Sequence, residues 1–165
     1  MLQDTLALDF ENELSEADWR VLAAIIDTEG SIYITKMHKD HRYISYDARV
    51  QIQMTSQEFI NFVYSLYKGS RYSENGRHDG WKSQFRWCLT GFKAIPFLHG
   101  ILPHLIIKKK QAELALELLN LRRQFNNSLR HPAFLKARGQ AIYDECGLLN
   151  KRGFSDEALS CYRIK

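Results

Sequence analysis

Residues 22–30 read Leu-Ala-Ala-Ile-Ile-Asp-Thr-Glu-Gly, and this stretch joins a predicted helix to a predicted β-hairpin. The helix covers residues 16–28: it begins at the capping box Ser15-Glu16-Ala17-Asp18, and Gly30 ends it. Asp27 and Glu29 stand at the helix C-terminus, where the helix dipole is negative and disfavours acids. A divalent cation nearby would offset that cost. Otherwise the two carboxylates would be solvated, or Asp27 would cap a neighbouring backbone.

Two β-hairpins are predicted downstream of this helix, each followed by another helix. The first covers residues 31–54 around a polar turn at 38–42, and the second covers about 70–89 around a turn at 75–80. In residues 48–53, Ala, Val and Ile alternate with Arg, Gln and Gln, and the second hairpin repeats this pattern. The alternation predicts a sheet with one buried face and one basic, amide-rich face.

The other predicted elements are helices. A second capping box, Thr55-Ser56-Gln57-Glu58, starts a helix that Gly69 ends. Further helices are predicted over about 92–101, 108–125 and 132–146. The predicted order is therefore α-β-β-α-β-β-α-α-α.

Length and composition set broader limits. The chain has 165 residues with a net charge of +4, which suits one globular domain. No apolar run reaches the roughly 18 residues that a membrane span needs, and the acidic N-terminus does not resemble a secretory signal. Three scattered cysteines form no disulfide or metal-binding pattern. These features predict an intracellular protein that does not span a membrane.

The small net charge hides an uneven distribution. Residues 1–30 hold eight acids and one base, whereas residues 31–123 hold fifteen bases and seven acids. The basic middle of the chain predicts a polyanion as partner. Charge alone is equally compatible with a solvated basic surface.

Residues 22–30 resemble the LAGLIDADG signature of homing endonucleases. Leu22, Ala23, Ile26, Asp27 and Gly30 are identical to it, and the other four positions are similar in size or charge. The α-β-β-α-β-β-α order over residues 16–125 also matches this family. The resemblance implies an α+β fold with a saddle-shaped antiparallel sheet and, here, extra C-terminal helices. It implies a single domain over 1–165 with its core at about 15–146.

The same resemblance implies a function: a site-specific, intron-encoded endonuclease that makes a double-strand break in DNA by metal-dependent phosphodiester hydrolysis. In this family the last acid of the motif faces the scissile phosphates, and here that acid is Glu29. The carbonyl of Thr28 matches a backbone ligand position, so both residues are implied to hold Mg²⁺ or another divalent cation such as Mn²⁺. A chain with one motif is implied to act as a homodimer on a long, near-palindromic target. The implied dimer contacts are Leu22, Ala23, Ala24, Ile26 and Asp27.

The outward side chains of the two hairpins form a predicted surface for double-stranded DNA. A two-stranded ribbon fits the major groove, where Arg and Gln read base edges. A register error of one residue would move every side chain to the other face. For any single residue, a half-buried sheet with a polar outer face gives the same pattern. By alternation, the predicted DNA contacts are Tyr33, Thr35, Arg49, Gln51, Gln53, Arg71, Lys82, Gln84 and Arg86.

Three lysines at 108–110 begin the helix over 108–125, although positive charge is unfavourable at a helix N-terminus. This mismatch predicts further polyanion contacts by Lys108 and Lys110. Residues 108–112 are similar to a K-x-K-Q-A segment of the single-motif branch, which implies that Lys108 stabilises phosphate charge or positions the attacking water in catalysis. That branch also has a catalytic glutamine after the second strand. Gln53 is the nearest equivalent here, although Met54 competes for the position.

The main alternative is a protein on the same fold that binds nucleic acid without cleaving it. Such a protein would be an intron maturase acting on its own intron RNA, or a DNA-binding regulator. It would keep the basic sheet and would not need an acid at position 29. The presence of Glu29 and Lys108 therefore favours cleavage.

Overall fold

The computed structural model describes residues 14–39, 43–74, 82–125 and 133–151. Four antiparallel strands form one sheet in the order β1-β2-β4-β3. The strands are β1 (Gly30–Lys39), β2 (Tyr43–Met54), β3 (Ser70–Glu74) and β4 (Gln84–Thr90). The α-helices are α1 (Glu16–Thr28), α2 (Gln57–Leu66), α3 (Ala94–Ile101), α4 (Lys109–Gln124) and α5 (Ala133–Leu149). Two short 3₁₀ helices, η1 (Gly91–Lys93) and η2 (Leu102–His104), flank α3.

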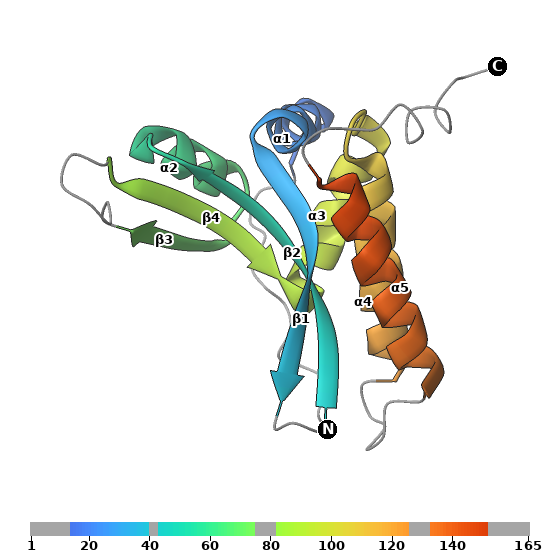
Figure 1. The fold of residues 1–165 in the computed structure, drawn as a ribbon. Coiled ribbons are helices and arrows are strands. Elements are labelled where there is room, and N and C mark those ends of the chain that lie inside the picture. The colour runs from blue at the N-terminus through green and yellow to red at the C-terminus, as the bar shows by residue number, and fades with distance from the viewer. Residues whose placement is uncertain (1–13, 40–42, 75–81, 126–132, 152–165) are drawn as a thin grey trace, which may run out of the picture.

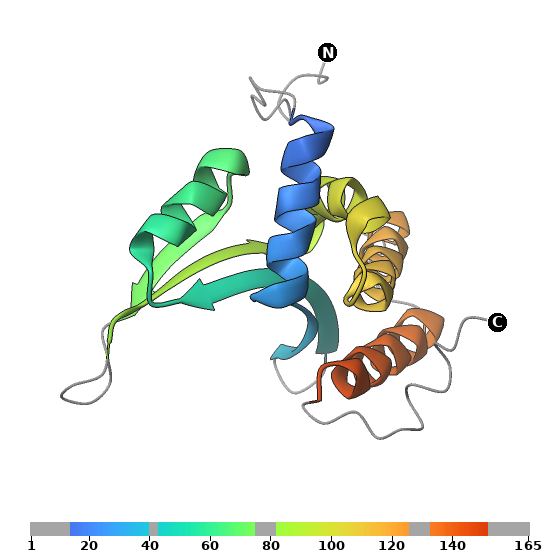
Figure 2. The same ribbon diagram turned by 90° about the horizontal axis from the view of Figure 1, so that it is seen from above.

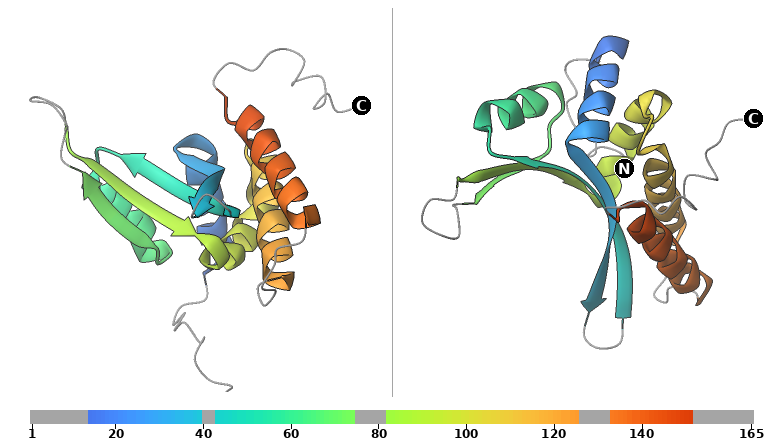
Figure 3. Two further views of the ribbon diagram at one scale, coloured as in Figure 1. Left: turned by 60° about the horizontal axis from the view of Figure 1, so that its bottom comes forward. Right: turned by 45° about the horizontal axis from the view of Figure 1, so that its top comes forward.

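The sheet is curved, and the described helices lie on its convex side (Figure 1). The β1–β2 and β3–β4 hairpins diverge from the centre of the sheet, which gives the predicted saddle shape (Figure 3). Seen from above, α1 runs between α2 on one side and α3, α4 and α5 on the other (Figure 2). The α+β class and the order of elements are therefore as predicted, and the concave face, called the open face below, carries none of the described helices.

Strand register assigns each side chain to one of the two faces. Ile32 is opposite Val50, and Ile52 is opposite Trp87. All four side chains are fully buried, so the alternate strand residues to which they belong face the helices. The residues between them face the other way, because successive side chains of a strand point to opposite sides of the sheet.

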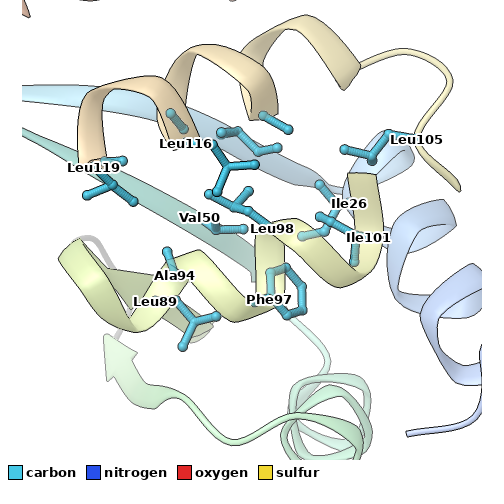
Figure 4. Packing of buried hydrophobic residues seen from close by; sticks show 14 of the residues in the cluster. Ile26, Val50, Leu89, Ala94, Phe97, Leu98, Ile101, Leu105, Leu116 and Leu119 are labelled. Carbon is cyan, nitrogen blue, oxygen red and sulfur yellow. The ribbon is translucent and has the colours of Figure 1, made fainter. Parts of the chain in front are cut away.

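Close packing of the helices against the sheet forms the core. Phe97, Leu98 and Ile101 of α3 are fully buried between α1, α4 and the sheet (Figure 4). Gly30 allows β1 to start directly beside α1: a Cβ atom there would lie 2.8 Å from the Ile26 Cα. Gly30 is thus required because the backbones of α1 and β1 approach each other closely at this residue. None of the described helices is both long and apolar enough to cross a bilayer.

Capping explains where two of the helices begin. Ser15 and Asp18 form the predicted reciprocal box at α1: the Asp18 N–H donates to Ser15 Oγ at 3.2 Å, and the Ser15 N–H donates to the Asp18 carboxylate at 3.0 Å. The prediction for α2 is shifted by one residue, because Ser56 rather than Thr55 is the N-cap and accepts from the Phe59 N–H at 3.2 Å. Ser56 has Phe59 rather than an acid three residues later, so α2 has a side-chain N-cap but not the predicted reciprocal box.

Candidate functional site

The buried acid Asp27 joins α1 to the segment that leads into α4. Only 8% of Asp27 is exposed. Its carboxylate accepts hydrogen bonds from the backbone N–H groups of Ile106 at 2.7 Å and Lys108 at 2.8 Å. These bonds satisfy the N–H of Lys108, the N-cap of α4, and that of Ile106 in the preceding segment, and they stabilise the carboxylate. Asp27 therefore caps a neighbouring backbone, which is one of the two structural roles expected from the sequence.

Lys108 lies against the C-terminal end of α1. Its Nζ donates to the Asp27 carbonyl oxygen at 2.5 Å. Burial lowers the pKa of the Lys108 ammonium below its ordinary value, while the negative charges of Asp27 and Glu29 oppose that shift. The structure thus brings Lys108 and the two motif acids together, as the resemblance implied.

Glu29 is the C-cap of α1, and its N–H donates to the Ile25 carbonyl at 2.9 Å. Glu29 is exposed, and within the described ranges its carboxylate has no hydrogen-bond or ion-pair partner. Thr28 is also exposed, and its hydroxyl donates to the Ala24 carbonyl at 2.9 Å. In the part of the chain that the structure describes, no three His, Cys, Asp or Glu residues cluster as a metal site. One chain thus offers one free carboxylate at this position.

Most of the residues predicted to contact a second copy of the chain do not lie on the exposed side of α1. Leu22, Ala23 and Ile26 are completely buried in the core of this chain, so they cannot also contact a second copy. Asp27 is occupied by α4, and of the five predicted contacts only Ala24 is exposed. The prediction was wrong for the buried residues because the motif helix packs two of its sides within one chain. The exposed stripe of α1 consists of Ala17, Val21, Ala24 and Thr28.

An apolar pair continues this surface beside the end of α1. Ile106 is 88% exposed and Ile107 is 64% exposed, although both side chains are large and apolar. They belong to the segment that Asp27 holds through the Ile106 N–H. Exposed apolar residues of this size next to one another are typical of an interaction surface.

The open face carries a chain of hydrogen bonds between polar side chains. The Tyr33 hydroxyl donates to Gln51 Oε1 at 2.9 Å, and Gln51 Nε2 donates to Gln53 Oε1 at 3.2 Å. Arg86 donates to the same Gln53 oxygen through Nε at 3.2 Å and Nη2 at 3.0 Å. Gln53 Nε2 in turn donates to Gln84. The register places these predicted DNA contacts on the open face together with Thr35 and Arg49.

Gln53 lies next to the first residue of β1, which directly follows Glu29. Its neighbour Ile52 is paired with Gly30, the first residue of β1. Met54 is paired with Phe85 and packs against the core, so it is on the helical side of the sheet. Of the two candidates for the catalytic glutamine position, only Gln53 faces the open side.

Three other predicted DNA contacts lie outside this network, and the structure contradicts only the prediction for Arg71. Arg71 is opposite Trp87 on the helical face, where it donates to Asn61 Oδ1 at 2.7 Å and stacks on Tyr64 of α2 at 3.8 Å. Its assignment to the DNA-binding face was wrong by one residue. Lys82 is exposed and precedes β4, and Lys110 lies 3.7 Å from Glu145 of α5.

The open-face residues of β3 are those the sequence prediction missed. Tyr72 is opposite Arg86 and Glu74 is opposite Gln84. All five β3 residues are exposed, so apolar alternation gives no signal for its phase. Only the pairing with β4, where Trp87 marks the buried side, could have supplied it.

Around these residues the open face forms a hollow of about 300 Å³. Two arginines, Arg49 and Arg86, and one acid, Glu74, line it. Burial raises the pKa of the Cys88 thiol in the same hollow, although the two arginines oppose the shift. The hollow is therefore a cationic depression that contains a single carboxylate.

Comparison with solved structures gives the fold a name. The homing endonuclease I-CvuI in complex with its target is 21% identical, with a TM-score of 0.67 over 88% of this chain and 91% of that one. The archaeal intron-encoded homing endonuclease I-Vdi141I complexed with DNA is 18% identical, with a TM-score of 0.67 over 88% and 94%. The LAGLIDADG homing endonuclease I-GzeII in complex with its DNA target is 17% identical, with a TM-score of 0.57 over 88% of this chain but 48% of that one.

No protein-family model matches the sequence, and the search of curated proteins gave no match. The resemblance seen at residues 22–30 is nevertheless confirmed at the level of the fold. This chain has the fold of the LAGLIDADG homing endonucleases.

Proposed function

We propose that this chain, which has the LAGLIDADG endonuclease fold, is a DNA endonuclease that acts as a homodimer and cuts both strands of a long, near-palindromic site. The observation that carries the proposal is the free carboxylate of Glu29 beside the ammonium of Lys108, at the end of β1 in the open polar sheet. A carboxylate with no ion-pair partner among the described residues, a half-buried ammonium and a curved polar sheet suit metal-dependent phosphodiester hydrolysis.

The open face supports binding to double-stranded DNA. Its Arg and Gln side chains have the donors and acceptors that read base edges in the major groove, which admits a two-stranded ribbon. The related structures I-CvuI and I-Vdi141I are both complexes with DNA. We infer that this chain binds DNA through the same face, with Tyr33, Thr35, Arg49, Gln51, Gln53, Gln84 and Arg86 as contacts.

A second copy of the chain completes the site in this proposal. One chain supplies a single free carboxylate, and it spans nearly all of I-CvuI but about half of I-GzeII. The exposed stripe of α1 contains small residues, which let two helices approach closely. A two-fold axis beside this stripe would bring two Glu29 carboxylates together and would require a near-palindromic target.

The donor set of such a dimer fits a hard divalent cation. Two Glu29 carboxylates and two Thr28 carbonyls are oxygen ligands, which Mg²⁺ and Mn²⁺ prefer. Asp27 is excluded as a ligand because two backbone N–H groups occupy its carboxylate. When bound, the metal would supply Lewis-acid stabilisation of the phosphate and activation of water.

The protein residues have separate roles in the proposed reaction. Glu29 would hold the divalent cation, and Lys108 would stabilise negative charge on the phosphate oxygens. Asp27 positions Lys108 through its backbone. Gln53 orients water at the end of the sheet.

A binding and cleavage experiment tests the proposal. The full chain selects sites from a randomised duplex library, and a plasmid carrying the selected site is then incubated with Mg²⁺ or with EDTA. We expect linearised plasmid only with Mg²⁺. Glu29→Gln should reduce cleavage by roughly 10²- to 10³-fold while leaving DNA binding intact. Glu113→Gln, the same change at an exposed site on α4, is the matched control and should cleave normally.

Three outcomes would contradict parts of the proposal. Normal cleavage by Glu29→Gln would remove Glu29 from the active site. Site selection without cleavage by the wild-type chain would favour the non-cleaving regulator, or a maturase if the chain promotes splicing of its own intron RNA. Failure to enrich any DNA sequence would reject DNA as the partner.

A further inference from the structure

Glu74 is an acid on the face that is proposed to bind a polyanion. It is the last residue of β3, lies opposite Gln84, and its side chain is 50% exposed. An acid on such a surface repels phosphates and lowers affinity for every DNA sequence. In a complex with DNA, a hydrogen-bond donor on a base would offset this repulsion if it met the carboxylate.

Arg86 holds this carboxylate in place. Glu74 Oε1 lies 3.3 Å from Arg86 Nη2, and the Arg86 side chain is 25% exposed. Arg86 is itself fixed, because its Nε and Nη2 both donate to Gln53 Oε1. The guanidinium therefore orients Glu74 and partly neutralises it before any ligand arrives.

The other carboxylate oxygen is available. Glu74 Oε2 has no partner among the residues that the structure describes, and the side chain lines the hollow on the open face with Arg49 and Tyr72. In contrast, Arg86 has already used its Nε and Nη2, the donors with which a side-on arginine would read guanine. In this pair the acid is thus better placed than the arginine to contact a base.

Major-groove chemistry limits what Glu74 can recognise. The donors that bases present in that groove are the exocyclic amino groups of cytosine (N4) and adenine (N6), whereas guanine and thymine present acceptors. A carboxylate accepts from the first two and is repelled by the last two.

We propose that Glu74, oriented by Arg86, is a specificity-determining residue that selects an amino-bearing base, cytosine or adenine, at one position of each half-site. The inference rests on the proposed DNA-binding function and extends it. Arg86 is a positioning residue for Glu74 in this scheme. The remaining polar network sets preferences at other positions.

Site selection by the full chain provides the first test. The wild-type chain should enrich C or A on one strand at one position per half-site. Glu74→Ala should lose that preference and keep the others, and it should bind a scrambled duplex more tightly because a repulsive charge is gone. Glu74→Gln should shift the same position toward adenine, since glutamine reads adenine. Glu113→Gln is again the matched control and should reproduce the wild-type profile.

Removing the amino group from the DNA tests the contact directly and distinguishes the two bases. If cytosine is selected, it is replaced by 2-pyrimidinone; if adenine is selected, it is replaced by purine. Either replacement should weaken wild-type binding by roughly 5- to 100-fold and leave Glu74→Ala binding unchanged.

Two results would overturn the inference while leaving the proposed function intact: a Glu74→Ala profile identical to the wild type, or equal losses for both proteins on the modified DNA. If the wild-type chain enriches no sequence, the proposed function and this inference are both rejected.

Discussion

Replacing Asp27 with asparagine should separate the roles of the two motif acids. The substitution keeps the size of the side chain but removes its charge and one of its two acceptor oxygens. One of the backbone donors, Ile106 N–H or Lys108 N–H, then faces an amide group that cannot accept. Because Asp27 is only 8% exposed, water cannot readily replace the lost acceptor.

The expected cost follows from these two contacts. A hydrogen bond to a charged group contributes about 1.5–3 kcal/mol, and a buried donor left without a partner costs about 1–3 kcal/mol. We therefore expect Asp27→Asn to lower the free energy of unfolding by about 2–4 kcal/mol. For a domain of this size that corresponds to a fall in Tm of roughly 5–15 °C.

Urea denaturation followed by circular dichroism measures this change. Asp144→Asn is the matched control, because Asp144 is exposed on α5 and, among the described residues, accepts only from Gln140, so its effect should stay within about 0.5 kcal/mol. Glu29→Gln should also unfold like the wild type, since its carboxylate is exposed. If Asp27→Asn unfolds at the same urea concentration as the control, the capping role assigned to Asp27 is wrong.

Three further predictions concern the interface, the helix–strand junction and alkaline stability. Ala24→Glu on α1 should convert the proposed dimer to a monomer in analytical ultracentrifugation, whereas Ala137→Glu on α5 should not; a persistent Ala24→Glu dimer would exclude α1 as the interface. Gly30→Ala should cost about 1–3 kcal/mol, because its Cβ would lie 2.8 Å from the α1 backbone. A Cβ atom at Gly147 would meet nothing within 4 Å, so Gly147→Ala should raise the free energy of unfolding by about 0.5–1 kcal/mol in urea titrations. Equal effects of the two glycine substitutions would refute the claim that close approach of α1 and β1 requires Gly30. Burial raises the pKa of Cys146 to about 11 from 9.0, so its contribution to stability is complete below pH 9 and is lost as pH rises through 11. The free energy of unfolding should therefore fall less steeply between pH 9 and 11 in Cys146→Ala than in the wild type. Parallel pH profiles of the two proteins would contradict the raised pKa of Cys146.

Local signals were sufficient to predict the framework. The capping box at Ser15 and the close-approach glycine at Gly30 set the ends of α1 by interactions within a few residues, and the predicted bounds agree with the structure. Alternation assigned β2 and β4 to the correct faces because both strands have a buried side. It failed for Arg71, since β3 is exposed on both sides and only pairing with β4 sets its phase.

The site depended on contacts that no local pattern contains. The carboxylate of Asp27 is bound by a backbone group 79 residues further along the chain, so the sequence could offer capping of a neighbouring backbone only as one possibility among several. The predicted dimer contacts at the buried positions of α1 were wrong for a related reason. A small-residue motif shows that a helix packs closely, but it does not say whether the partner is the same chain or another.

The contact between Asp27 and the start of α4 couples stability to the proposed chemistry. The same residue that caps the backbone at Lys108 also accepts, through its carbonyl, the hydrogen bond from the Lys108 ammonium. A change that weakens the hydrogen bond between the Asp27 carboxylate and the Lys108 N–H therefore lets the Lys108 ammonium move away from Glu29, even in molecules that remain folded. Asp27→Asn should accordingly lose cleavage activity at temperatures well below its own unfolding transition. Such a loss would follow from the position of Lys108, because DNA binding by the distant sheet residues would be unchanged.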